Sequence, residues 1–307
     1  MKNHFYYQSK DGKTRIHAIE WAPETEVKAV LQISHGMVEY IDRYDEFAHF
    51  LSQRGYYVVG QDHLGHGESV HNDSCHGYFH ETHGNEYVIG DIHKLRKITS
   101  KKYPDVPYFM LGHSMGSFLT RQYITIYGDG LSGVIIMGTG NQPLPLIRLG
   151  KILCRIIAGL KGWTYRSSFI NNMAFGSYNK RFQPARTKMD WLSKNEDNID
   201  SYLKDPWCTF LFTVNAYYHM FRGIEQLSLR KNFDRIPRNL PVFFVAGKDD
   251  PVGNFGKGVT TVWRKYKKSG FKDVSLKLYE NGRHEILNET DRHIVFRDIY
   301  LWLKKHQ

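Results

Sequence analysis

Residues 108–123 read YFMLGHSMGSFLTRQY, in which an apolar run, a G-x-S-x-G motif and a helix-like stretch follow one another. This order predicts a sharp strand-to-helix turn whose central residue, Ser114, is held in a strained backbone conformation. Gly112 and Gly116 leave room for neighbouring elements to close in around the turn. Ser114 would then present its hydroxyl at a strand end and at the positive end of a helix, where a nucleophile is useful. The motif is common by itself, so this interpretation depends on the rest of the chain.

The composition is that of a folded globular protein. The chain has 307 residues, of which 41% are hydrophobic and 14% aromatic, enough for a sizeable core. Its three cysteines show no short repeated spacing, which argues against a disulfide scaffold and fits a reducing compartment. The N-terminal residues lack the apolar stretch of a signal peptide, and no apolar run is long enough to span a bilayer. We therefore expect a cytoplasmic protein.

Two possible kinds of partner are disfavoured by the sequence. The net charge is +11, but no run of Lys and Arg exceeds three residues and no nucleic-acid motif is present, so we predict no nucleic-acid binding. Six histidines and one cysteine crowd residues 63–83, but their spacing is irregular and matches no metal-binding pattern. We interpret this stretch as a histidine-rich surface loop and predict no metal site.

Apolar, β-branched runs alternate with helical patterns along most of the chain, which predicts right-handed crossovers and a mostly parallel sheet. Strands are predicted at 14–21, 27–34, 56–60, 108–111, 133–138, 240–247 and 275–279, and helices at 43–54, 85–102, 117–123 and 291–305.

This alternation stops between residues 141 and 235, where no apolar run resembles a parallel strand. We therefore predict a core in two parts, residues 1–140 and 236–307, with residues 141–235 inserted as a helical cap, or lid. The insertion begins with an apolar stripe from Leu149 to Leu160 at helical spacing, interspersed with Lys and Arg. Such a helix can lie on a membrane or cover a lipid-binding pocket. It can equally pack on the core with a solvated cationic face.

Three loops that follow predicted strands carry Ser114, then Asp249 and Asp250, then His284. Because the carboxyl ends of parallel strands share one edge of a sheet, these side chains are expected to lie together. A serine hydroxyl needs a base to take its proton, and a histidine base needs an acid to hold its tautomer. A further strand runs into His35-Gly36-Met37, whose backbone N–H groups are suited to an oxyanion hole, although an ordinary strand-to-loop glycine would read the same.

With these motifs the chain resembles α/β-hydrolases of the monoacylglycerol lipase and lysophospholipase group, also classified as serine aminopeptidase S33-like. The matching stretches are residues 35–39 with 43–44, 62–69, 112–116, 247–252 and 282–284. The resemblance implies an α/β-hydrolase fold with a mostly parallel sheet of the eight-stranded type, flanked by helices. Tyr40 departs from it, because relatives often have a histidine there.

The resemblance also implies roles for individual residues. Ser114 would be the nucleophile, His284 the general base and Asp250, which precedes Pro-Val, the acid of the triad, with Asp249 as the alternative. The N–H groups of Met37 and Met115 would form the oxyanion hole. No metal or organic cofactor is implied, and no substrate-binding residue can be assigned.

We therefore expect a serine carboxylester hydrolase that acts on a small-molecule acyl ester, of the monoacylglycerol or lysophospholipid type, with transient membrane-surface contact through the cap. The alternatives are a small-ester esterase, an S33-like aminopeptidase and a non-catalytic ligand receptor on the same fold, because one fold serves many functions.

Overall fold

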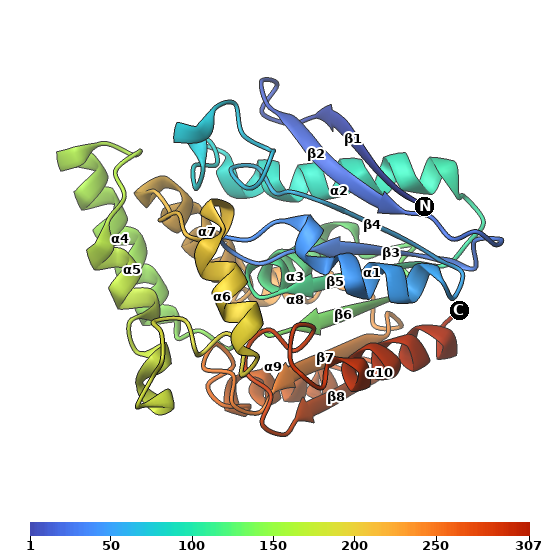
Figure 1. Cartoon of the computed structure of the whole chain (residues 1–307). Helices are drawn as coiled ribbons and strands as arrows, with labels where there is room; N and C mark the ends of the chain where they lie inside the picture. Colours follow the sequence, from blue (N-terminus) through green and yellow to red (C-terminus); the bar gives the residue numbers. More distant parts are fainter.

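The computed structural model describes all 307 residues and contains one eight-stranded sheet, in the order β1-β2-β4-β3-β5-β6-β7-β8 (Figure 1). The strands are β1 (Lys2–Gln8), β2 (Arg15–Trp21), β3 (Ala29–Ser34), β4 (Tyr56–Gln61), β5 (Tyr108–His113), β6 (Gly133–Met137), β7 (Val242–Gly247) and β8 (Val274–Tyr279). All pairings from β4 through β8 are parallel, whereas β1 with β2 and β2 with β4 are antiparallel. This is the α/β-hydrolase architecture that the sequence predicts.

The central strands are buried along their whole length, which explains their continuous apolar runs. Successive residues nevertheless face opposite sides of the sheet. On β3, Val30 joins a core cluster of 40 buried residues. Its neighbour Leu31 joins a cluster of 25 buried residues on the other face. The sheet is therefore the middle of three layers.

Helices cover both faces of the sheet. The larger cluster is completed by α2 (Gly84–Lys102), α3 (Met115–Tyr127) and α9 (Lys257–Lys268), and the smaller one by α1 (Asp45–Ser52) and α10 (Arg292–Lys305). No helix in the structure is both long enough and apolar enough to cross a membrane.

Strand β1 is the one strand that the sequence pattern did not predict. It lies at the sheet edge, pairs only with β2, and has a single buried residue, Tyr7. Its pairing depends on backbone hydrogen bonds, so its side chains carry no strong apolar alternation.

Between β6 and β7 every regular element is a helix, as predicted, and loops connect the helices. The elements are α4 (Leu144–Lys161), α5 (Ser168–Phe175), η3 (Tyr178–Phe182), α6 (Glu196–Lys204), η4 (Pro206–Cys208), α7 (Val214–Gln226) and α8 (Arg230–Phe233). Two short 3-10 helices, η1 (Ile41–Tyr44) and η2 (Asp73–Cys75), lie earlier in the chain. In Figure 1, α4 and α5 lie farthest from the sheet. The division into core and cap stays a prediction at this point.

Candidate active site

Ser114 occupies the turn between β5 and α3 with φ 52° and ψ −118°, a conformation that costs roughly 1–3 kcal/mol in a non-glycine residue. The neighbouring glycines make this turn possible. A Cβ on Gly112 would lie 2.3 Å from the Gly116 oxygen, and one on Gly116 would lie 2.0 Å from the Ser34 oxygen. The Ser114 N–H donates to the Met137 carbonyl at 3.0 Å. The strained serine is therefore held by packing and by a hydrogen bond that its N–H donates to β6.

His284, in the loop after β8, lies beside Asp250, in the loop after β7. Its Nδ1 is 3.0 Å from Asp250 Oδ2, within ion-pair distance, both side chains are buried, and neither atom has a hydrogen-bond partner in the protein. The other oxygen of Asp250 accepts from the Val252 N–H at 2.8 Å. Asp249 is partly exposed, and its N–H donates to the Gly282 carbonyl. Of the two candidate acids, Asp250 is the one that the structure brings to His284.

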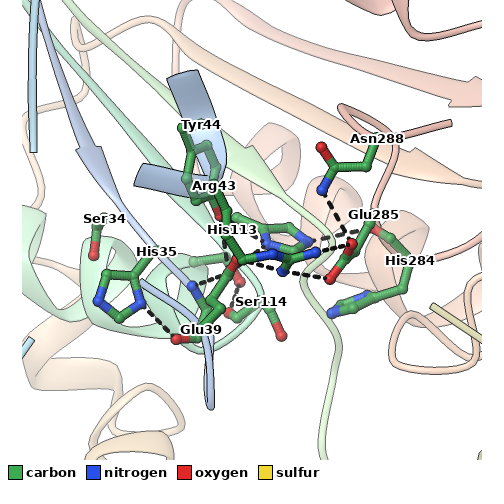
Figure 2. Close-up of polar contacts among 12 residues, drawn as sticks. Ser34, His35, Glu39, Arg43, Tyr44, His113, Ser114, His284, Glu285 and Asn288 are labelled. Carbon is green, nitrogen blue, oxygen red and sulfur yellow. Dashed lines mark hydrogen bonds and ion pairs between the residues drawn. The ribbon is translucent and has the colours of Figure 1, made fainter. Parts of the chain in front are cut away.

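The same histidine lies close to the serine turn. The His284 ring centroid is 4.8 Å from that of His113, the residue that precedes Ser114. Figure 2 shows His113, Ser114 and His284 near one another at the strand ends. The three loops that carry the predicted catalytic residues thus meet at the strand ends, as the strand order requires.

The loop after β3 approaches Ser114 from the other side, since a Cβ on Gly36 would lie 3.1 Å from Ser114 Cβ. The His35 Nδ1–H donates to the Gly36 carbonyl at 2.7 Å, because Nε2 of that ring already accepts from the His63 N–H at 2.9 Å. A trans peptide is planar, so fixing the Gly36 oxygen also fixes the direction of the Met37 N–H. That N–H has no acceptor in the protein.

The second predicted oxyanion donor, Met115, is the first residue of α3, where a helix leaves its N–H groups unpaired. The loop after β3, on the other side of Ser114, also contains a residue with a strained backbone. Val38 has φ 54°, an outlier for a β-branched residue, and its carbonyl accepts from the Tyr202 hydroxyl on α6 at 3.1 Å. Both predicted donors are thus available on either side of Ser114.

A buried network of charges lies beneath these loops (Figure 2). Arg43 donates to both oxygens of Glu285, at 2.9 and 2.8 Å, and to Glu39 at 3.0 Å. Glu39 contacts His113 Nδ1 at 3.1 Å and also accepts from the Gly36 N–H. The network joins the loop of Gly36, the residue before Ser114 and the residue after His284, so it holds all three loops in one arrangement.

The charges of this network balance. Burial alone would raise the pKa of Glu285, but the Arg43 guanidinium overcomes it and lowers that pKa to about 2. Burial also opposes the ionisation of Glu39, whose pKa is lowered by His113 and Arg43. Burial lowers the pKa of His113, yet Glu39 raises it overall. Two carboxylates therefore face a guanidinium and an imidazole whose protonated form is favoured.

Sequence reasoning did not assign a role to this network. Its members stand next to predicted residues, because His113 precedes Ser114 and Glu285 follows His284. A charged residue directly beside a buried catalytic candidate was the sequence feature that could have indicated this network.

Tyr40 is the position at which the chain departs from the family pattern. Its hydroxyl donates to Asp205, beside η4, at 2.6 Å.

The structure corrects the interpretation of the histidine-rich stretch, residues 63–83, as a surface loop. This stretch is not simply a surface loop, because His63, His66 and His76 are buried. His63 contacts His35, as described above, and His66 packs among Phe79, Phe210 and Phe212. Irregular spacing does not reveal burial when the chain turns through glycines. None of the six histidines takes part in a three-ligand group.

Comparisons with known proteins identify the family and the fold of the chain. A family model described as "Serine aminopeptidase, S33" matches residues 25–291. Monoglyceride lipase of Mus musculus is 27% identical over 287 residues, which are 92% of this chain and 84% of that protein. Monoacylglycerol lipase of Mycolicibacterium smegmatis is 24% identical, covering 96% of this chain and 95% of that protein. The crystal structure of a highly thermostable carboxyl esterase from Bacillus coagulans matches with a TM-score of 0.92 at 28% identity, covering 99% and 98% of the two chains.

The sheet, the serine turn and the loops at the strand ends define an α/β-hydrolase. Within that class, the chain belongs to the serine aminopeptidase S33 family, and it is a hydrolase similar to monoglyceride lipases.

Proposed function

We propose that this hydrolase cleaves carboxylic esters through Ser114, His284 and Asp250. The observation that carries the proposal is the contact between His284 Nδ1 and the buried carboxylate of Asp250, 3.0 Å apart, beside a serine in a strained turn. Asp250 holds the imidazole with Nδ1 protonated, which leaves Nε2 to take the proton from Ser114 Oγ.

The reaction then proceeds in two halves. Ser114 Oγ attacks the ester carbonyl, and the negative charge on the carbonyl oxygen is stabilised by the N–H groups of Met37 and Met115. His284 passes its proton to the departing alcohol, and an acyl group remains on Ser114. Water, activated by the same histidine, attacks the acyl-enzyme and releases the acid. No step requires a metal or an organic cofactor.

The helical segment 141–235 supports the proposed cap, because its residues contact the site directly. The ring centroid of Trp191 lies 5.3 Å from that of His284. The Glu285 N–H donates to the Leu192 carbonyl at 2.7 Å. From α6, Tyr202 reaches Val38, as described above, and Asn198 donates to Glu285 at 2.8 Å. We therefore place the cap at residues 141–235, over a core formed by residues 1–140 and 236–307.

The outer face of α4 supports an acyl-lipid substrate and contact with a lipid surface. Five large apolar side chains of this helix are exposed: Leu146 at 60%, Leu149 at 46%, Ile152 at 56%, Ile156 at 53% and Leu160 at 80%. The opposite face packs on α7 through small residues such as Gly150, Cys154 and Ala158. The predicted apolar stripe is therefore turned outward in large part, which favours the lipid-contact interpretation over simple packing on the core.

The basic residues of α4 complete this surface. Arg148 and Lys151 pair with Glu225 on α7, while Arg155 and Lys161 contact the tyrosines Tyr218 and Tyr165. Two cations beside an apolar face suit an anionic lipid surface.

The chain's three cysteines are unpaired, which supports a cytoplasmic location.

The substrate class follows from these features and from the relatives. The proteins from mouse and M. smegmatis are monoglyceride and monoacylglycerol lipases, and an exposed apolar helix suits a substrate with one long acyl chain. We therefore place monoacylglycerols and lysophospholipids first. A short-chain carboxylester is the second candidate, favoured by the likeness to the B. coagulans carboxyl esterase.

Hydrolysis of p-nitrophenyl esters from acetate to palmitate, by the wild type and by Ser114→Ala, tests the proposal. We expect the variant to lose activity on the order of 10⁴-fold or more, and the wild type to prefer medium or long chains. Activity confined to acetate and butyrate would favour the second candidate. A folded wild type that hydrolyses no ester would reject an ester hydrolase and leave a peptidase or a ligand receptor.

A further inference from the structure

A second group of polar side chains lies on the β1–β2 hairpin, at the sheet edge away from β7 and β8. His4 on β1 and His17 on β2 share one face of this pair, because His17 is opposite Tyr6, two residues after His4. Glu68, in the loop after β4, approaches the same face. Nδ1 of His4, Nε2 of His17 and a carboxylate oxygen of Glu68 all lie within 4.8 Å of one another.

The three groups have the chemistry and nearly the spacing of metal ligands. The His4 and His17 nitrogens are 2.9 Å apart, and Glu68 Oε1 is 3.8 Å from His17 Nε2. Zinc bonds of about 2.0–2.1 Å at tetrahedral angles place ligand atoms roughly 3.3 Å apart, so small side-chain movements would suffice. Two imidazoles and one carboxylate, with a fourth position for water, form a common zinc ligand set.

Further residues hold two of these ligands in place. His17 Nδ1 lies 2.8 Å from Oδ2 of the fully buried Asp62, which directs Nε2 of the same ring toward His4 and Glu68. The Tyr6 hydroxyl donates to Oε2 of Glu68, which leaves Oε1 as the oxygen nearer to His17. A carboxylate behind a ligating histidine is a recurring support of zinc sites, because it fixes the tautomer and raises ligand basicity.

We propose that His4, His17 and Glu68 bind a divalent transition-metal ion, Zn²⁺ in the first place. His4 and Glu68 are exposed, so the ion can enter from solvent and keep a water ligand. Imidazole ligands select Zn²⁺ over Mg²⁺ and Ca²⁺, which prefer oxygen. The ion would join the edge strand β1, which pairs only with β2, to the loop that follows β4. Its role is structural and separate from ester hydrolysis.

Titration of the untagged protein with zinc chloride, in the presence of a competing chelator, measures this site. We expect one tightly bound Zn²⁺ per wild-type chain and a zinc-dependent rise in Tm. His4→Phe and Glu68→Gln should each weaken binding by at least about 10-fold, because each removes one of three ligands. His49→Phe is the matched control, since His49 is an exposed histidine 3.1 Å from a carboxylate, that of Asp45, outside the group.

Three outcomes would overturn the proposal. They are no zinc uptake by the folded wild type, wild-type affinity in both His4→Phe and Glu68→Gln, or an equal loss of affinity in His49→Phe. Ester hydrolysis by each variant reports that it is folded. Co²⁺ in place of Zn²⁺ adds a spectroscopic reading, because visible absorption typical of a tetrahedral or five-coordinate ion should be present in the wild type and absent in His4→Phe.

Discussion

The strand ends around Ser114 and the outer face of α4 depart from the usual distribution of side chains in opposite directions. Near Ser114, the charged groups Glu39, Arg43 and Glu285 are buried or nearly so, and they pair with one another. On α4, apolar side chains such as Ile156 and Leu160 are exposed. Buried polar groups and exposed apolar surfaces are the informative exceptions in a protein. The charged groups of the first region are paired within the chain, whereas the apolar side chains of the second are left exposed.

The largest expected effect separates two adjacent residues in the first region. Asp250→Asn should lower kcat on the order of 10⁴-fold, because an amide beside His284 favours the wrong tautomer. Asp249→Asn, which changes a partly exposed neighbour, should change it by less than about threefold. The hydrolysis rate of one p-nitrophenyl ester measures both. Equal losses, or the reverse order, would contradict the assignment of the acid.

The buried network should also dominate stability. Arg43→Met leaves two buried carboxylates without their cation and should cost about 3–5 kcal/mol of the free energy of unfolding in urea. Lys248→Met breaks an ion pair with Glu280 in which the side chains are 52% and 71% exposed, and should cost less than about 1 kcal/mol. If both changes cost the same, the network would have no special share in holding the three loops.

The dependence of stability on pH tests the charge state of this network. Because the pKa of His113 is raised in the folded protein by Glu39, its bound proton stabilises the fold. That contribution is fully present below a pH of about 6.5, the ordinary histidine value, and is lost as pH rises through the raised pKa. Glu39 stays ionised over this range, since its own pKa is lowered.

We therefore expect His113→Gln to destabilise the protein more at about pH 6 than at about pH 9, as measured by urea unfolding at both values. His49→Gln, at a histidine with a 46% exposed side chain, serves as the control and should show little difference between them. A larger cost at the higher pH would mean that His113 is neutral in the folded state.

The central fold and the candidate residues could be predicted from local features of the sequence. Features that depend on tertiary contacts could not be predicted in this way. The continuous apolar runs of the buried strands and the glycines around Ser114 follow from local geometry, so they could be recognised. Strand β1 was missed because an edge strand needs no apolar pattern. The pairing of Arg43 with Glu285 joins distant positions, and no local spacing indicates it.

The sequence likewise left open whether the apolar face of α4 meets the core or solvent. Its apolar stripe predicted a helix with a distinct face, but helical spacing does not tell whether that face meets the core or solvent. The small residues Gly150, Cys154 and Ala158, which share the opposite face, gave the missing signal. A helix can approach its neighbour closely through such residues, and a Cβ on Gly150 would lie 2.8 Å from the Phe221 ring on α7. The larger side chains are then left facing outward.

The smallest expected effect concerns this outward face. Ile156→Asp and Leu160→Asp each remove an exposed apolar side chain, at 53% and 80% exposure, and should each weaken binding to anionic vesicles by about 10-fold. Hydrolysis of a short soluble ester should stay within about twofold, because neither side chain is packed in the core. Ile126→Asp is the matched control, since Ile126 is 55% exposed on α3, away from α4.

Vesicle co-sedimentation and ester hydrolysis, measured on the same preparations, separate the interpretations. Loss of vesicle binding alone, confined to the α4 variants, would mean that the exposed face is completed by lipid. Loss of both properties together would mean that α4 supports the active site through packing and that its exposed apolar residues have no lipid partner. Equal loss in Ile126→Asp would mean that an added negative charge anywhere on this basic protein reduces binding, and that α4 has no special part in it.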